Sequence, residues 1–159
     1  VASDWSSDVC SSDLKHLPSM HITIINGPNL NLLGTREPEI YGSTSFEEFL
    51  LELKKRFAHV SFDYFQSNHE GAMIDKLQSS NGNTDGIILN AAGYSHTSIA
   101  LADSIKAITT PVIEVHISNI QEREEFRKIS VTAPVCDKQI YGQGLDGYLQ
   151  AIDFIRNLS

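Results

Sequence analysis

Three polar residues alternate with apolar ones in a stretch that is otherwise typical of a buried strand. Glu114, His116 and Ser118 lie within residues 111–118, so a strand would place all three side chains on one face. Both faces of a central parallel strand are normally apolar, and burying a carboxylate without partners is costly. A carboxylate beside an imidazole orients the ring and favours its protonated form. We therefore favour a general-acid site here over a purely structural network of polar groups.

A second candidate pair lies in residues 26–42, a stretch rich in glycine, proline and asparagine. The stretch is too long for an ordinary strand-to-helix connection, which indicates a lid or an insertion. It contains Arg36 and Tyr41, and a guanidinium beside a phenol favours the phenolate form. Tyr41 is thus a candidate general base. Taken alone, the residues favour the plainer alternative, in which Tyr41 packs the loop against the following helix and Arg36 is solvated.

Two further groups are candidates for binding an anion. Residues 95–97 (Ser-His-Thr) follow a small-residue turn and begin a predicted helix, whose free N–H groups favour negative charge. An ordinary N-cap with an exposed histidine is an equally good explanation. Arg123 and Arg127 share one face of a predicted helix over 121–128. They could clamp a carboxylate or simply pair with neighbouring glutamates, so alone they are weak support for an anion site.

Composition excludes several classes of function. The chain has 12 basic and 20 acidic residues and a net charge of -8, which disfavours nucleic acid and anionic lipid as partners. Its apolar stretches are too short to span a bilayer, so we expect no membrane association and a cytoplasmic location. The other histidines lack metal-ligand spacing and the two cysteines supply no zinc site. Motifs of zinc proteases, α/β-hydrolases, P-loop proteins and Rossmann folds do not occur, so we expect no metal site.

Regular elements must position these residues. From Met20 onward, short β-rich runs alternate with longer helical ones, which is typical of a parallel sheet. The predicted strands are 21–26, 60–66, 86–90, 111–118 and 138–141, and the predicted helices are 45–59, 69–80, 95–108, 121–128 and 145–158. The expected fold is α/β, a flavodoxin-like, doubly wound, five-stranded parallel sheet with helices on both faces and its ligand site beyond the carboxyl ends of the strands.

The chain is expected to contain one domain. Residues 20–159 carry the alternating pattern and are predicted to form a single catalytic domain. Residues 1–19 show no helical or strand period and contain a near-repeat of Ser-Ser-Asp. We expect them to be an appended, disordered leader.

Several motifs at the predicted strand ends resemble those of type II 3-dehydroquinate dehydratase. They occur in the order of that family, from about Met20 to the C-terminus: Asn-Gly-Pro-Asn-Leu-Asn-Leu-Leu-Gly (26–34), Arg-Glu-Pro (36–38), Tyr-Gly (41–42), Ile-Leu-Asn (88–90), Ser-His-Thr-Ser (95–98) and Glu-Val-His-Ile-Ser-Asn (114–119). One departure is Ala-Ala-Gly at 91–93, where many relatives carry a glycine pair. The resemblance implies a flavodoxin-like enzyme that converts 3-dehydroquinate to 3-dehydroshikimate in the shikimate pathway without metal or organic cofactor. It also implies a homo-oligomer, a dodecamer of trimers.

The resemblance further implies a role for each matching residue. Tyr41 corresponds to the base, Arg36 to the residue that keeps this tyrosine ionised, and Asn29 to the amide that holds an ordered water or the enolate oxygen. His116, oriented by Glu114, corresponds to the acid that protonates the leaving hydroxyl. The other matching positions bind substrate or belong to the lid: Asn90, His96, Asp103, Ile117, Ser118, Arg123 and Arg127. Asp103 is expected to reach the site of a neighbouring subunit.

The main alternative is a flavodoxin-like binding module without catalysis. An FMN carrier needs a phosphate loop rich in serine and threonine after the first strand, and a phosphoacceptor receiver domain needs paired acidic residues there. Residues 26–31 supply neither. Elimination of water next to a ketone needs a base, a stabiliser of the enolate and an acid. Because each of these has a candidate at a strand end, the enzyme hypothesis is favoured.

Overall fold

Five parallel strands form one sheet in the computed structural model, which describes residues 19–159. In chain order they are β1 (Met20–Asn26), β2 (Val60–Gln66), β3 (Gly86–Asn90), β4 (Val112–His116) and β5 (Lys138–Tyr141). They lie side by side in the order β2-β1-β3-β4-β5. The strand order reverses at β1, as in a doubly wound, flavodoxin-like sheet, so the predicted fold is confirmed. The leader predicted over 1–19 lies outside the described residues except for Ser19.

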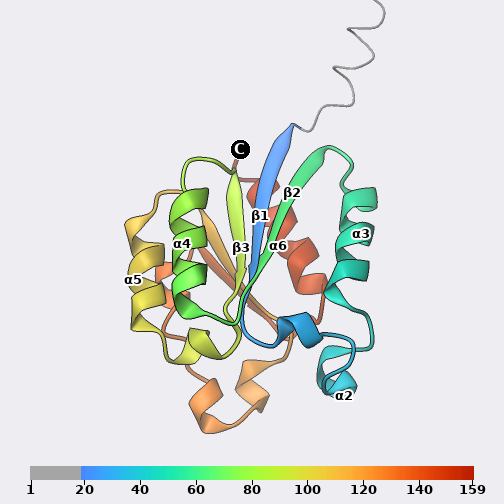
Figure 1. Cartoon of the computed structure of the whole chain (residues 1–159), viewed down its shortest axis with the longest axis vertical. Helices are drawn as coiled ribbons and strands as arrows, with labels where there is room; N and C mark the ends of the chain where they lie inside the picture. The colour runs from blue at the N-terminus through green and yellow to red at the C-terminus, as the bar shows by residue number, and fades with distance from the viewer. Residues whose placement is uncertain (1–18) are drawn as a thin grey trace, which may run out of the picture.

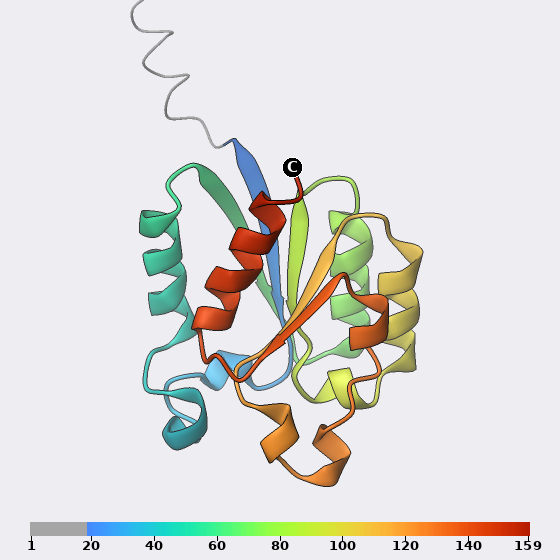
Figure 2. The ribbon, with the colours of Figure 1, turned by 180° about the vertical axis from the view of Figure 1, so that it is seen from behind.

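Helices cover both faces of the sheet. The α-helices are α2 (Pro38–Tyr41), α3 (Phe46–Arg56), α4 (Glu70–Ser80), α5 (Ile99–Ala107) and α6 (Asp146–Arg156). Short 3-10 helices lie between them: η1 (Leu30–Leu32), η2 (Ala92–His96), η3 (Ile120–Glu122), η4 (Glu125–Arg127) and η5 (Ala133–Val135). Figures 1 and 2 show α4 and α5 on one face of the sheet and α3 and α6 on the other. Within residues 19–159, none of these helices has the length and apolarity needed to cross a membrane.

The side chains of β4 divide between two hydrophobic clusters. Ile113 and Val115 belong to the cluster beneath α3 and α6, whereas Val112 belongs to the cluster beneath α4 and α5. Because successive side chains of a strand point to opposite faces, Glu114 and His116 lie on the α4 and α5 side. They are 0% and 5% exposed. A buried strand therefore carries two polar groups on one face, as its alternation predicts.

The helix α3 leads out of the long stretch that follows β1. It begins with a capping box, in which the Ser45 side chain accepts from the Glu48 N–H while the Glu48 side chain accepts from the Ser45 N–H. Glu47 and Glu48 in the first turn suit the helix dipole. Phe46, Phe49 and Leu53 form its buried stripe. This firm helix fixes the end of the stretch that carries Tyr41.

The helix predicted over 95–108 is wrong at its start. Residues 92–96 form η2, and α5 begins only at Ile99, with Ser98 as its N-cap. The Ser98 Oγ accepts from the Leu101 N–H at 2.9 Å. Ala92 has a φ of 51°, a left-handed conformation that breaks the chain out of β3 before a helix can form. Residues 95–97 are therefore not the first turn of an α-helix, and the anion site predicted there loses its physical basis.

The helix predicted over 121–128 is also wrong. Two single turns, η3 and η4, are separated by Arg123 and Glu124, and both residues have extended backbones. Arg123 and Arg127 thus do not share a helical face. Instead both guanidiniums approach the Glu124 carboxylate, with Nε to Oε2 separations of 3.6 and 3.0 Å. Helical hydrogen bonding is limited to these two single turns.

Candidate active site

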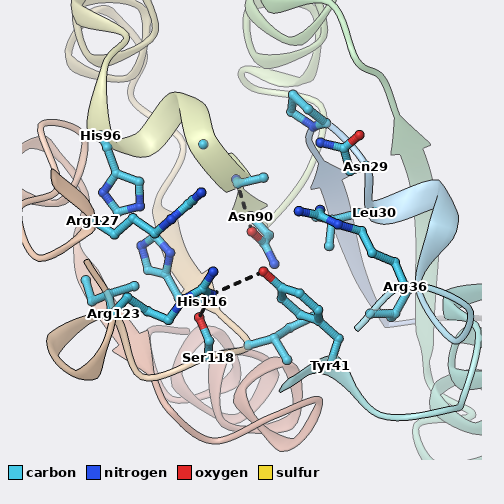
Figure 3. Close-up of a pocket in the computed structure, with 16 residues that line it drawn as sticks. Asn29, Leu30, Arg36, Tyr41, Asn90, His96, His116, Ser118, Arg123 and Arg127 are labelled. Atoms are coloured by element: carbon cyan, nitrogen blue, oxygen red, sulfur yellow. Dashed lines mark hydrogen bonds between the residues drawn. The ribbon is translucent and has the colours of Figure 1, made fainter. Parts of the chain in front are cut away.

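The carboxyl ends of the strands meet at one edge of the sheet, and a pocket lies there (Figure 3). The loop after β1, the turn after β3 and the segment after β4 form its walls. The predicted site residues that line it are Asn29, Arg36, Tyr41, Asn90, His96, His116, Ile117, Ser118, Arg123 and Arg127. The other lining residues were not predicted as site residues: Pro28, Leu30, Leu33, Ala92, Gly93 and Ile120. The fold therefore brings together side chains from segments far apart in the sequence.

His116 lines the pocket, and a buried carboxylate lies behind it. His116 Nε2 lies 2.9 Å from Glu114 Oε2. Burial raises the pKa of Glu114, but the hydrogen bond and charge of His116, with hydroxyl donors from Thr132 and Ser130, hold it below the ordinary carboxyl value. Glu114 does not itself line the pocket. Its place behind His116 is that of an orienting group.

Two arginines approach Tyr41, but in a different manner from the prediction. Arg123 Nη1 donates to the Tyr41 hydroxyl at 3.3 Å and to Ser118 Oγ at 3.2 Å (Figure 3). The Arg36 guanidinium lies over the Tyr41 ring, 5.7 Å from its centroid, and pairs with Glu37 at 3.4 Å. The guanidinium that contacts the phenol oxygen is therefore that of Arg123. Sequence spacing missed this contact because the two residues lie 82 positions apart.

The bond to Tyr41 also acts on the arginine. That hydrogen bond is the largest cause of a raised pKa at Arg123, with Glu124 and Glu37 adding to it against the opposing effect of burial. Arg123 thus brings a permanent positive charge to the hydroxyl of Tyr41.

The loop after β1 is held on one side by amides from the end of β2. Asn29 has a left-handed backbone, with φ at 68°, and its N–H donates to Asn68 Oδ1 at 3.0 Å. Gln66 Nε2 donates to the Gly27 carbonyl at 3.1 Å and to Asn68 Oδ1 at 3.2 Å. These contacts keep Asn29 at the pocket. The amide residues of 66–68 were the available signal in the sequence, and they were not singled out.

Buried amides join the ends of β1 and β3. The two strands pair Asn26 with Asn90, and both side chains are buried. The hydroxyl of Tyr148 in α6 donates to Asn26 Oδ1 at 2.7 Å and accepts from Asn90 Nδ2 at 3.1 Å. Asn90 Oδ1 accepts from the Ala92 N–H at 3.2 Å. The Asn90 side chain is thus fixed from both ends where it reaches the pocket.

The wall opposite Asn29 is formed by η2 and the segment after β4. His96 Nδ1 lies 2.7 Å from the Ile129 carbonyl, and the His96 and His116 rings stack with centroids 5.8 Å apart. Burial is the main cause of a lowered pKa at His96, so its neutral form is favoured. Arg127 lines the same wall and donates through Nε to Glu124 Oε2 at 3.0 Å. This wall offers a neutral imidazole and a cation to a ligand.

One predicted site residue lies apart from the others. Asp103 is on the exposed face of α5 and does not line the pocket of its own chain. Among residues 19–159, no three or more histidine, cysteine or carboxylate side chains form a group that could hold a metal ion. The polar groups that line the pocket are a phenol, a hydroxyl, imidazoles, amides and guanidiniums.

Comparison of the sequence with known proteins identifies its family. The model of the family described as dehydroquinase class II matches residues 20–156. The chain belongs to the class II dehydroquinase family. Relatives named 3-dehydroquinate dehydratase include one from Campylobacter jejuni, 49% identical over 87% of this chain and 93% of its own length. Another, from Dinoroseobacter shibae, is 46% identical over 86% of this chain and 92% of its own length.

A solved structure of a type II dehydroquinase is similar to this one. The type II dehydroquinase from Butyrivibrio crossotus is 51% identical and covers 86% of this chain and 97% of its own, with a TM-score of 0.81. The family membership that the motifs predict is therefore confirmed by both sequence and structure.

Proposed function

We propose that this dehydroquinase converts 3-dehydroquinate to 3-dehydroshikimate and water. The family membership and the names of the relatives support this substrate. The observation that carries the proposal is the joint presence of Tyr41, Arg123 and the Glu114–His116 pair around one pocket. A β-elimination next to a ketone needs a base, a stabiliser of the enolate and an acid, and these groups fit those roles.

The first step removes a proton from the carbon next to the ketone. The Tyr41 phenolate accepts this proton, and the charges of Arg123 at its oxygen and of Arg36 over its ring support the phenolate form. The electron pair moves onto the carbonyl oxygen to give an enolate. Asn29, held at the pocket by Asn68, is the amide that stabilises this oxygen directly or through an ordered water.

The second step expels the hydroxyl group as water. Because His116 Nε2 faces Glu114, Nδ1 is the nitrogen left to protonate the leaving oxygen. The enolate then collapses to the ketone and forms the new double bond. The carboxylate behind the imidazole stabilises its charged form before the proton is given up.

The remaining pocket residues bind the substrate. Arg127 supplies a cation for the substrate carboxylate, and its neighbour His96 is a neutral partner for a hydroxyl. Asn90, Ile117 and Ser118 lie at the ends of β3 and β4, where backbone and side-chain groups can bond the other hydroxyls. The positively charged side chain thus binds the carboxylate, and the neutral groups bind the hydroxyls.

Replacing the base provides the main test. Tyr41→Phe removes the phenol oxygen and keeps the ring, so dehydration of 3-dehydroquinate should fall to near background while the protein stays folded. Formation of the conjugated product is followed by its ultraviolet absorbance. Tyr141→Phe, at an exposed tyrosine outside the pocket, is the control and should keep wild-type rates. Near wild-type turnover by Tyr41→Phe would exclude the proposed base.

The route through an enolate can be separated from one through an imine. No lysine lines this pocket among the described residues, and an imine route requires a lysine amine. Borohydride added with substrate should therefore leave the activity unchanged, with or without a chelator. Substrate-dependent inactivation would contradict the enolate route.

We also propose that Asp103 acts on the pocket of an adjacent copy in a homo-oligomer, a dodecamer of trimers. Its exposed position on α5 is open to a second chain. Asp103→Ala should lower the dehydration rate without changing the fold of the single chain. Sedimentation velocity reports the assembly state, and a monomer with full activity would refute this part of the proposal.

A further inference from the structure

The carboxylate of Glu114 has an unusual place in the fold. It lies on a central strand with its side chain 0% exposed, and His116 occupies only one of its acceptor positions. An ionised carboxylate can accept about four hydrogen bonds. Burying it with most of these unmade would cost enough to neutralise the group. Other donors must therefore hold its charge.

Gln139 supplies one of these donors from the neighbouring strand. The register of β4 and β5 pairs Glu114 directly with Gln139, so both side chains lie on the same face. Gln139 Nε2 donates to Glu114 Oε2 at 3.0 Å. This is the same oxygen that bonds His116. Gln139 thus fixes the position of the atom that orients the imidazole.

Thr132 supplies a second donor, next to η5. Its side chain is 0% exposed, and its Oγ1 donates to Glu114 Oε1. Thr132 therefore holds the oxygen that His116 does not use, which prevents the carboxylate from rotating. Ser130 Oγ lies 2.9 Å from Oε2 and 3.1 Å from Oε1. Since it also accepts from the Ala133 N–H, Ser130 serves the turn as well as the carboxylate.

The surroundings of Glu114 hold few other charges. His116 faces it from β4, and His96 stacks on His116 from η2. Cys136 lies near it after η5, and burial together with the Glu114 charge raises the pKa of that thiol. Both histidines stand on the pocket side. The neutral donors Thr132, Ser130 and Gln139 therefore complete the shell that keeps the carboxylate ionised.

We propose that Thr132 and Gln139 are positioning residues for the dehydration, which hold the Glu114 carboxylate in place so that it directs the His116 ring into the pocket. The inference rests on the proposed function of His116 as the acid. Neither residue lines the pocket, so both act only through Glu114. Loss of either donor makes the carboxylate more basic and frees it to turn.

Thr132→Val tests this directly, because valine keeps the branched shape and removes the hydroxyl. We expect kcat to fall about tenfold with KM within a factor of two, in keeping with loss of one hydrogen bond to a charged group. Thr132→Ser restores the donor and should restore kcat.

Gln139→Leu provides an independent variant at a partly exposed position. It should show the same fall in kcat with little change in KM, and it serves as the test should Thr132→Val fail to fold. Gln150→Leu, on the exposed side of α6, is the matched control and should change neither property. Wild-type kcat in both folded variants would overturn the inference.

A second measurement separates this inference from the proposed function. Urea unfolding across pH 3 to 7 reports the Glu114 carboxylate without any substrate. The loss of stability as the pH falls below the ordinary carboxyl pKa of 4.5 should be smaller in Thr132→Val than in the wild type and Thr132→Ser, because the carboxylate is stabilised less in the folded chain. An equal loss in all three proteins would refute the role of Thr132 in holding the charge. An active His116→Ala variant would instead refute the proposed acid, whatever the unfolding data show.

Discussion

At the scale of single residues, the phenol of Tyr148 has a position that few side chains could fill. Its ring lies in the cluster beneath α3 and α6, stacked edge-on against Phe46 and Phe49. Its hydroxyl ends between the amides of Asn26 and Asn90. Burial raises the pKa of Tyr148, so the group stays neutral and keeps its hydrogen to donate. The Tyr148 hydroxyl thus connects the hydrophobic core to Asn90, which lines the pocket.

Tyr148→Phe removes that oxygen and leaves Asn26 Oδ1 and Asn90 Nδ2 without their partner. We expect the free energy of unfolding to fall by roughly 1–3 kcal/mol, the usual cost of a buried unpaired polar group. Urea denaturation followed by circular dichroism measures it. Tyr64→Phe is the control, because its hydroxyl lies at 3.5 Å from Asn26 Nδ2 and is only partly buried, and it should cost less. Equal losses would show that the amides are not held in this way.

The proposed role of His116 as the general acid depends on a single atom, Nδ1 of its ring. His116→Ala should lower kcat by about 100- to 10,000-fold, the range for loss of a general acid, while substrate still binds. Steady-state kinetics and a binding isotherm separate the two effects. His59→Ala, at an exposed position before β2, should be silent. A variant that lost affinity but kept its turnover would reassign His116 to binding.

At the scale of elements, α6 packs closely on the start of β3. A Cβ added to Gly86 would lie 2.6 Å from Ile155 Cδ1 and 2.8 Å from both Cγ atoms of the same side chain. A β-branched side chain cannot turn all three atoms away at once, so the helix itself would have to move. The hydrogen at Gly86 is thus what lets α6 approach the sheet and bring Tyr148 to the amides.

Gly86→Ala should therefore lower the free energy of unfolding by about 1–3 kcal/mol, as other overpacked cores do. Gly71→Ala is the matched control in α4, where nothing lies within 4 Å of an added Cβ. There alanine's better helix propensity should raise stability by less than about 1 kcal/mol. Thermal and urea unfolding of the two variants test the contrast, and a neutral Gly86→Ala would show that α6 packs more loosely than described.

The elements also show how far the sequence predicts the structure. The strands 60–66, 86–90 and 138–141 are confirmed at their predicted bounds, because short apolar runs in an alternating βα pattern have few other solutions. The helices over 95–108 and 121–128 are wrong in part, since the left-handed Ala92 and the extended Arg123 depend on contacts made by the folded chain. The local periodicity of the sequence does not predict such contacts.

The candidate site follows the same rule. The Glu114 and His116 row was predicted because polar residues stand out on a central strand. The Arg123 contact to Tyr41 and the Thr132 and Gln139 contacts to Glu114 were missed. They join segments distant in the sequence, which local patterns do not reveal. The roles of the site residues in the reaction stay predictions.

For the whole molecule, the buried polar groups predict how stability depends on pH. Glu114 and His96 both have a lowered pKa in the folded chain, so the unfolded chain binds protons first as the pH falls. The contribution of His96 should decline below its ordinary value of 6.5, and that of Glu114 below 4.5. Urea unfolding at a series of pH values should show stability falling through both ranges. Glu114→Gln should flatten the lower one, and an unchanged acidic slope in that variant would contradict this assignment.

The contact between Arg123 and Tyr41 has a consequence for how a negatively charged molecule is received. Both hydrogen bonds of the guanidinium, to the phenol and to Ser118, use Nη1. A guanidinium carries five hydrogens on three nitrogens. Nη2 can therefore donate to an anionic ligand while Nη1 stays bonded to the phenol. Binding of an anion at Nη2 would therefore leave the hydrogen bond between Nη1 and Tyr41 in place. A lysine, whose charge sits on a single nitrogen, would have to divide that nitrogen between the two tasks.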